Sequence, residues 1–494
     1  MPATSTESRT NILLLVTDQH RADTIRSYGH SICETPALDS LAAAGTRFDA
    51  AFTPTAICTP ARASLVTGVL PFRHKLLANS ELNVGYREEL DDTYPSFAYA
   101  LHDAAYHTGH VGKWHVGKER GPDAFGFEGV HYPGWGNPVE HPTYTAWLEK
   151  RGLPPYRISE EIRAISPNGQ EGSLLAGVLE QPVDATFEAF LADQAIERLR
   201  AYAASWHEQH QPFFLGVHWF GPHLPYCIPR DWFERYDPAS IELPRSIAET
   251  FAGKPRVQAQ YSAYWGFDSL SLETWRRLIA AYLGYVAMID EQIQRVLGAA
   301  QELGLWDSTA VIFTADHGEF TGSHRLISKA PAMYDDIYRI PMIARIPGAP
   351  AGRTDTRFAS LLDLTPTILD LAGVTIPDHM DGRSLAPLTR GDEQLEWRDA
   401  IFAEFHGLHF PYPQRMIRTE RYKLVVNPAD INELYDLGTD PDELHNRYNH
   451  PELGTIRRQL LARLYEELRR RGDNFYHWMT TMYEIGDTVH GTTP

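Results

Sequence analysis

Hydrophobic positions along the first three quarters of the chain follow two alternating patterns. Residues 11–18 form a continuous apolar run that ends in a carboxylate, which is typical of a buried strand in a parallel sheet. Runs at residues 212–218 and 310–314 predict two more such strands. Helical periodicity separates the runs, at residues 37–44, 187–203 and 272–303. This alternation predicts an α/β fold with a mostly parallel central sheet sandwiched by helices.

The pattern changes near residue 400. We expect residues 401–405 to form the last strand of the main sheet. Beyond them, short strands alternate with turn residues and precede an amphipathic helix, at residues 422–426, 433–436 and 453–471. The chain is therefore predicted to divide into a large α/β domain, residues 1–405, and a smaller antiparallel sheet with one helix, residues 406–494.

Two segments lack a clear period. Residues 134–184 are rich in proline and glycine, so we interpret them as an insertion of long loops. The tail beyond Gly472 carries aromatic residues that we expect to dock on the parent domain or on a neighbouring subunit of a homo-oligomer: Phe475, Tyr476, Trp478 and Tyr483.

Composition limits the classes of partner. Of the 494 residues, 43% are hydrophobic, which is enough for a sizeable core, and the net charge is −19. Such an acidic chain is not expected to bind nucleic acid, which requires basic patches to meet the phosphates. A site for an anionic substrate must therefore gather positive charge locally, against the field of the whole molecule.

The amino-terminal residues and the cysteines indicate the compartment. Residues 1–10 are polar and lack the basic start of a secretory signal, and the apolar run at residues 12–16 is too short for a signal or a membrane span. The cysteines, Cys33, Cys58 and Cys227, predict no disulfide framework. We expect a cytoplasmic protein without membrane contacts; the alternative is a mature form whose signal has been removed.

The strongest chemical signal is the run Cys58-Thr59-Pro60-Ala61-Arg62. Pro60 suits the first turn of a helix, which places Cys58 just before a helix N-terminus, where backbone N–H groups favour an anion. Arg62 falls about one turn along the same face. A lone cysteine is more often a small buried hydrophobe, but Pro60 and Arg62 favour a functional Cys58.

A second signal lies at two predicted strand ends. Asp316 and His317 directly follow the run 310–314, and Asp18 ends the first strand. Ligands in open α/β sheets bind beyond the carboxyl ends of the strands, so one cation is within reach of all three side chains. The alternative is structural, with Asp316 as a helix cap and His317 as a core residue.

The run from Cys58 to Arg62 resembles the signature of the sulfatase family. Residues 105–115, with Lys113 and His115, resemble its second signature, although Ala105 stands where a glycine is more usual. Residues 432–437 and 440–443 resemble its C-terminal subdomain. The resemblance implies the fold of the alkaline phosphatase superfamily, with residues 1–405 as the catalytic domain. It also implies that a formylglycine-generating enzyme oxidises Cys58 to an aldehyde, whose hydrated form attacks sulfur.

The resemblance implies roles for further side chains. Lys113 would neutralise a sulfate oxygen, and His115 would hold the second hydroxyl of the hydrated aldehyde or act as a base. His223 would donate to the sulfate or protonate the leaving group. Lys329 would contact sulfate and nucleophile, although Ser328 replaces the usual glycine before it. Three neighbouring residues are expected to surround the site or lie at the surface: Asn79, Glu319 and His324.

The resemblance also implies one divalent cation, Ca²⁺, bound by Asp18, Gln19, Cys58, Asp316 and His317. Many sulfatases have a second aspartate where Gln19 stands. An amide oxygen still ligates but brings no charge, and an imidazole makes the site softer, which leaves Mn²⁺ and Mg²⁺ open.

The expected activity is hydrolysis of a sulfate monoester of a small alcohol or a saccharide. A phosphonate monoester or phosphodiester hydrolase is the first alternative, because some of these enzymes also pair aspartate with glutamine, as in Asp18-Gln19; Lys113 and His115 favour the sulfatase. A binding protein without activity is the second, against which the intact residue set argues. Residues 134–187 and 243–270, which carry no motif, correspond to loops that shape the leaving-group pocket in the family, so the alcohol stays open.

Overall fold

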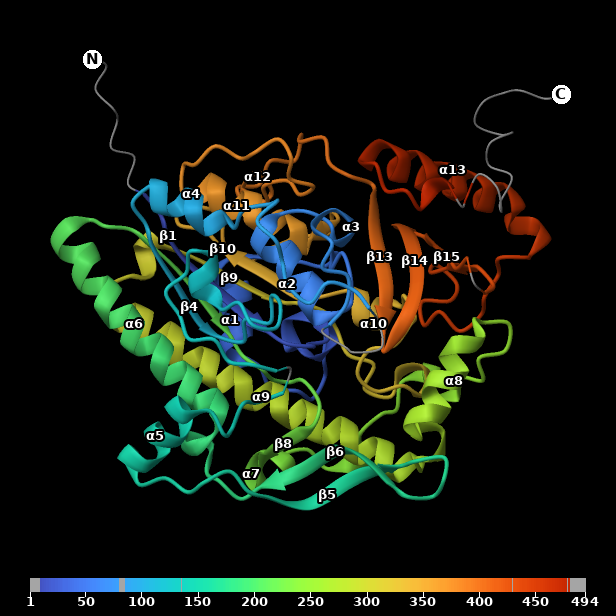
Figure 1. Cartoon of the computed structure of the whole chain (residues 1–494), viewed down its shortest axis with the longest axis horizontal. Coiled ribbons are helices and arrows are strands. Elements are labelled where there is room, and N and C mark those ends of the chain that lie inside the picture. Colours follow the sequence, from blue (N-terminus) through green and yellow to red (C-terminus); the bar gives the residue numbers. More distant parts are fainter. Residues whose placement is uncertain (1–8, 80–84, 135, 429, 478, 480–494) are drawn as a thin grey trace.

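The computed structural model of the chain describes residues 9–79, 85–134, 136–428, 430–477 and 479. Its centre is a seven-stranded sheet with the order β11-β2-β10-β9-β1-β7-β4 (Figure 1). Strands β4, β7, β1 and β9 are parallel neighbours, whereas β10 runs antiparallel to β9 and to β2. The mostly parallel sheet predicted from the sequence is confirmed, in the strands β1 (Asn11–Thr17), β2 (Thr46–Phe48), β4 (His107–Gly112), β7 (Phe213–His218), β9 (Thr309–Ala315), β10 (Met342–Arg345) and β11 (Arg353–Asp355).

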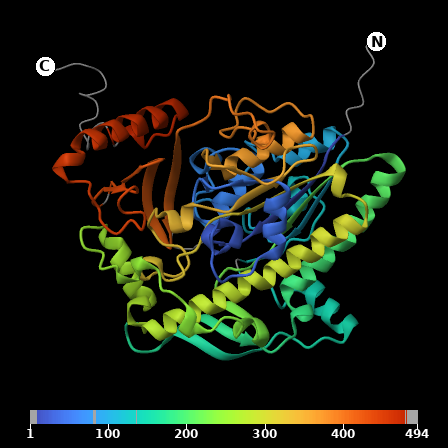
Figure 2. The ribbon, with the colours of Figure 1, turned by 180° about the vertical axis from the view of Figure 1, so that it is seen from behind.

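Helices cover both faces of this sheet because β1 is apolar on both. Leu13 and Leu15 belong to one buried cluster, and Ile12, Leu14 and Val16 to the other. The first cluster includes residues of α1 (Pro36–Ala44), α6 (Phe187–Gln209) and α9 (Leu272–Glu302), and the second those of α2 (Cys58–Thr67), α4 (Phe97–Asp103), α11 (Leu364–Leu371) and α12 (Ala386–Thr389). Figures 1 and 2 show the long α6 and α9 on the side of the sheet opposite α2, α4 and α11.

The parallel register brings the predicted site segments to one edge. Thr17, the last residue of β1, is paired with Ala315, the last residue of β9, and Val16 is paired with His218 at the end of β7. The chain therefore leaves three adjacent strands at the same level of the sheet. Asp18 and Asp316 follow directly, as the sequence predicts.

A second sheet lies near the carboxyl terminus. Its four antiparallel strands have the order β13-β14-β15-β16 and pack against α13: β13 (Ala400–Leu408), β14 (Phe410–Thr419), β15 (Tyr422–Val426), β16 (Glu433–Asp436) and α13 (Gly454–Arg471). The prediction that residues 401–405 end the main sheet is wrong, because β13 pairs with the next strand along the chain, β14. The two prolines of β14 conceal that partner in the sequence. The predicted boundary between residues 405 and 406 would fall inside β13. The division of the chain into these two domains stays a prediction.

The segment 134–184 is not a set of long loops, contrary to the prediction. It contains α5 (Pro142–Arg151) and a hairpin of β5 (Ile158–Ile165) and β6 (Glu171–Leu179), and β6 pairs in parallel with β8 (Tyr226–Pro229). Much of β5 faces solvent, which removes the apolar run expected of a strand. The missed signal is Asn168-Gly169 between the two strands, with Gly169 at φ +79°.

The remaining α-helices and strands are β3 (Ala51–Phe52), α3 (Pro71–His74), α7 (Arg230–Phe233), α8 (Arg256–Trp265), α10 (Asp335–Tyr338) and β12 (Ala359–Ser360). Phe475 and Tyr476 of the predicted tail pack with α13, whereas Trp478 and Tyr483 lie outside the described residues. Within the described ranges, no helix combines the length and apolar character that crossing a membrane requires.

Ala105 ends α4 in a conformation that favours glycine. Its φ is +63°, and it lies beyond the C-cap Ala104, where Ala105 N donates to His102 O (2.8 Å) and Tyr106 N to Leu101 O (3.0 Å). Ala105→Gly should raise the free energy of unfolding by roughly 0.5–1 kcal/mol, because glycine adopts positive φ without a steric cost. Denaturant unfolding measures this. Ala104→Gly, at φ −87°, is the control and should give no gain; an Ala105→Gly protein no more stable than wild type would contradict the expectation.

Candidate active site

Cys58 opens the helix that carries the strongest sequence motif. The sequence predicts Cys58 just before a helix, whereas α2 begins at Cys58 itself. It ends at Thr67 and is followed by the C-cap Gly68, which has φ +72°. Pro60 lies in the first turn, as predicted. Cys58 is fully buried, so its Sγ atom faces the interior of the site and not bulk solvent.

Arg62 joins the ends of the four parallel strands. Its guanidinium donates from Nε to Asp316 Oδ2 (2.8 Å) and from Nη2 to Asp18 Oδ2 (3.3 Å), at the ends of β9 and β1. Nη1 donates to Lys113 O (2.8 Å), directly after β4, and lies 3.2 Å from His218 Nδ1, at the end of β7. Arg62 is 1% exposed. His218 is not among the site residues predicted from the sequence. Its one indication in the sequence is that it is a polar residue at the end of an apolar strand.

Four donor groups at this edge form a site that fits a divalent cation. Ligand atoms of Asp18, Cys58, Asp316 and His317 all lie within 4.8 Å of one another. The Nδ1 atom of His317 donates to Gly318 O (2.8 Å), so Nε2 is the ring nitrogen that faces the other donor atoms and would bind a metal once deprotonated. Two carboxylates and one oriented imidazole are ligands that divalent cations accept, so the donor set agrees with the expected metal.

Gln19 is held between two partners of opposite charge. Its Nε2 donates to the buried Glu319 carboxylate, and its Oε1 accepts from Lys329 Nζ (2.9 Å). A carboxylate only accepts hydrogen bonds, so the amide N–H side must face Glu319 and the oxygen must face Lys329. Glu319 also accepts from Ser328 N, where φ is +65°. Glu319 is therefore part of the site's support, and Gln19 as a metal ligand stays a prediction.

Cations surround Cys58. Lys113 forms an ion pair with Asp18, and the His115 side chain hydrogen-bonds Cys58. Burial alone would raise the pKa of the Cys58 thiol, but Lys329, Lys113 and His317 outweigh it and hold that pKa well below its ordinary value. For His115, burial has the opposite effect and lowers the pKa, because it disfavours the charged imidazolium. The position of Cys58 Sγ is therefore one that stabilises negative charge.

His223 reaches the same cluster from the loop after β7. Its Nε2 lies 3.3 Å from Lys329 Nζ, and its Nδ1 donates to Leu224 O (2.5 Å). The peptide bonds Gly221–Pro222 and Leu224–Pro225 beside it are cis. Every site residue predicted from the sequence therefore lies in one connected cluster.

The three neighbouring residues differ in their contacts. Asn79 Oδ1 accepts from Thr59 N (3.1 Å) at the first turn of α2. His324 is buried, stacks on Tyr334 and has its Nδ1 2.9 Å from Glu249 Oε2. Asn79 and Glu319 therefore support the site directly, whereas His324 anchors the loop that leads to Lys329.

The chain is similar to known proteins over most of its length. The sequence model of the family described as "Sulfatase" matches residues 10–374, well over half of the chain. The chain belongs to the sulfatase family. A second model, described as "N-sulphoglucosamine sulphohydrolase, C-terminal", matches residues 322–470. The sulfatase match contains every residue assigned to the site, so the protein is a hydrolase of this family within the alkaline phosphatase superfamily.

Individual relatives extend over nearly the whole chain. "Uncharacterized sulfatase YidJ" of Escherichia coli (strain K12) is 30% identical over 479 residues, 95% of this chain and 90% of that one. An arylsulfatase of Clostridium perfringens (strain 13 / Type A) is 28% identical over 494 residues, 94% of this chain and 95% of that one. The crystal structure of the phosphonate monoester hydrolase of Agrobacterium radiobacter superposes with a TM-score of 0.78 at 28% identity, over 94% of this chain and 96% of that one. The sulfatase-like fold is thus confirmed.

Metal affinity should depend on Asp316. Asp316→Asn keeps an oxygen for the N–H groups of Gln19 and His317 but removes a charged donor, so metal affinity should fall at least about tenfold. Calorimetric titration of metal-free protein measures the loss, and elemental analysis of purified protein checks it. Asp307→Asn is the matched control, because the exposed Asp307 lies just before the other end of β9. Undiminished affinity in Asp316→Asn would contradict this metal site.

Proposed function

We propose that the protein hydrolyses a sulfate monoester to an alcohol and inorganic sulfate, with a formylglycine made from Cys58 as the nucleophile. The observation that carries the proposal is the position of Cys58 Sγ, 3.2 Å from His317 Nε2 and 4.0 Å from Asp18 Oδ1. The thiol occupies the place that the oxygens of the modified side chain would take. Membership of the sulfatase family and likeness to an arylsulfatase support this choice.

The modification and the metal supply the reactive chemistry. A hydrated formylglycine at position 58 offers one hydroxyl to attack sulfur and a second to release sulfate. Asp18, Asp316 and His317, with Gln19, would hold the cation, for which we propose Ca²⁺ with Mn²⁺ or Mg²⁺ as alternatives, and a bound cation lowers the pKa of a neighbouring hydroxyl. Cys58 is 0% exposed, so the formylglycine-generating enzyme must act before the chain has folded.

The side chains of the protein stabilise charge and move protons. Lys329 and Lys113 lower the pKa of Cys58 more than its other neighbours do. The same two ammonium groups would neutralise oxygens of the sulfuryl group. His115, which hydrogen-bonds Cys58, would hold the second hydroxyl. In its imidazolium form, with Nδ1–H held by Leu224 O, His223 would give the alcohol the proton on Nε2 and become neutral. Arg62 would keep the two carboxylates in place.

Hydrolysis of phosphonate monoesters is the second candidate. The likeness to the phosphonate monoester hydrolase of Agrobacterium radiobacter, with a TM-score of 0.78, supports it, as does Gln19 in place of a second aspartate. Sulfate monoesters and phosphonate monoesters both carry one negative charge, so the cations around Cys58 favour neither. Lys113 and His115 favour the sulfate ester, because they match the second sulfatase signature.

A substrate pair decides between these candidates. The value of kcat/KM for an aryl sulfate should exceed that for the matching aryl phosphonate monoester. Cys58→Ala should lower turnover of both by roughly 10⁴-fold or more, because the nucleophile is lost. Cys33→Ala, which alters a buried cysteine outside the site, should keep activity. A preference for the phosphonate would establish the second candidate, and wild-type turnover by Cys58→Ala would overturn both.

His223 should show its role through the leaving group. His223→Ala should lower kcat for an alkyl sulfate by roughly 10²-fold, because a poor leaving group needs the proton, but lower kcat for a nitrophenyl sulfate far less. The measurement is kcat across a series of sulfate esters whose alcohols differ in pKa. Equal losses across the series would refute His223 as the general acid.

A further inference from the structure

The loop that carries His223 is fixed to the sheet through Gly221. Trp219 N donates to Val16 O (2.9 Å), and Asp18 N donates to Gly221 O (3.1 Å). On its other side, Gly221 N donates to Glu188 Oε1 (2.9 Å). Gly221 therefore lies between a proposed metal ligand and a carboxyl group that no sequence motif indicates, two residues before the proposed general acid.

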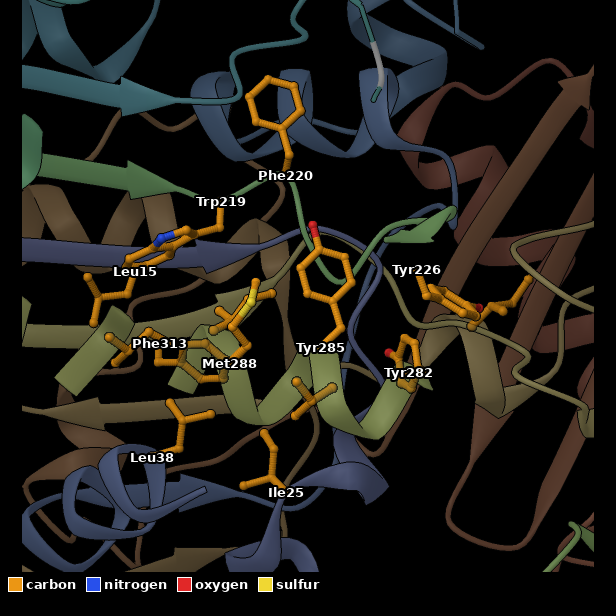
Figure 3. Packing of buried hydrophobic residues seen from close by; sticks show 14 of the residues in the cluster. Leu15, Ile25, Leu38, Trp219, Phe220, Tyr226, Tyr282, Tyr285, Met288 and Phe313 are labelled. Atoms are coloured by element: carbon orange, nitrogen blue, oxygen red, sulfur yellow. The ribbon is translucent and has the colours of Figure 1, made fainter. Parts of the chain in front are cut away.

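Glu188 reaches this loop from the first turn of α6. It is 1% exposed, and its Oε1 also accepts from the Tyr285 hydroxyl of α9 (2.8 Å). Its own carbonyl oxygen accepts from Trp219 Nε1 (3.3 Å). Figure 3 shows the Tyr285 hydroxyl pointing toward the segment between Phe220 and Tyr226. Two helices thus converge on the loop through one carboxyl group.

Helix capping does not explain Glu188. The N-cap of α6 is Thr186, whose Oγ1 accepts from Ala189 N (3.2 Å), and the Thr186 carbonyl accepts from Phe190 N (3.0 Å). The Glu188 carboxyl instead points away from its own helix, toward the loop. Besides Gly221 N, the backbone N–H of Phe220 hydrogen-bonds the carboxyl. Burial raises the pKa of Glu188 to about 7. A buried carboxyl is costly for stability, and this one is bonded to the loop and not to its own helix, which favours a role beyond packing.

The Tyr285 ring also packs closely against Gly221. A Cβ atom on Gly221 would lie 2.4 Å from that ring, so the backbone approaches Tyr285 more closely than any residue with a side chain could. Without the acceptor on Glu188, Gly221 N would lose its partner in the interior. The loop would then shift, and with it the imidazole of His223.

We propose that Glu188 is a positioning residue: through Gly221 it sets the place of the His223 imidazole beside Lys329. This inference rests on the proposed function of His223 and extends the site to α6 and α9. Glu188 acts in this role as a hydrogen-bond acceptor, through Oε1, and a negative charge on its carboxyl is not required. Tyr285 acts through the same oxygen.

Four variants test the proposal by kinetics. Glu188→Leu removes the acceptor and should lower kcat for an alkyl sulfate about tenfold, with a smaller loss for a nitrophenyl sulfate, as His223→Ala does. Glu188→Gln keeps an acceptor oxygen and should restore turnover. In the His223→Ala background, Glu188→Leu should add little, because both changes act through one imidazole. Metal content should not change. Losses that multiply, or a Glu188→Gln protein as slow as Glu188→Leu, would overturn the proposal.

Hydrogen–deuterium exchange supplies a readout that needs no turnover. The peptide covering residues 219–225 should exchange faster in Glu188→Leu and in Tyr285→Phe, which retains the ring but not the hydroxyl, than in wild type or Glu188→Gln. Unchanged exchange in both variants would overturn the positioning role even if activity fell. Faster exchange with no leaving-group dependence in His223→Ala would instead reject the proposed function of His223 and leave the positioning intact.

Discussion

The site depends on one buried guanidinium. Arg62 contacts residues at the carboxyl ends of the four parallel strands: Asp18, Asp316, Lys113 and His218. Two carboxylates at 0% exposure lie side by side here, and burying both is costly in free energy unless a cation compensates their charge. Because Arg62 is planar and presents donors in a fixed fork, it sets the distances between the strand ends as well as their charge balance. The position of Cys58, one turn earlier on the same helix, follows from that anchor.

The same arrangement reconciles an acidic protein with an anionic substrate. The chain has a net charge of −19, yet Arg62, Lys113 and Lys329 all lie around one buried cysteine. Because these side chains are buried, their charges act at short range and in a low dielectric, so the distant acidic surface matters little. A divalent cation held by Asp18 and Asp316 would add to the positive field. Lys329, Lys113 and His317 already hold the pKa of Cys58 well below its ordinary value, against the effect of burial.

Much of the site could be predicted because its residues follow strands in short local motifs. Asp18, Asp316 and His317 each come directly after an apolar run, and the parallel register then brings them together. His218 and Glu188 could not be predicted in this way. Each is a single polar residue within an apolar stretch, and its meaning depends on contacts with Arg62 and Gly221, which are distant in sequence.

The errors in the fold have a similar cause. Strand β5 is only partly buried and β14 contains prolines, so neither shows the apolar run that marks β1. Both are defined by their hairpin partners instead. Two departures from the family pattern gain a physical meaning only from the backbone. Ala105 and Ser328 replace usual glycines, and both have positive φ, at +63° and +65°. Backbone conformation alone therefore explains a preference for glycine at both positions.

The most direct measurement is mass spectrometry of the peptide that contains Cys58, from active protein produced together with a formylglycine-generating enzyme. The peptide should carry an aldehyde in place of the thiol, and the fraction converted should rise in proportion to kcat across preparations. An unmodified thiol in fully active protein would contradict the claim that the cations and carboxylates around position 58 serve an oxidised cysteine.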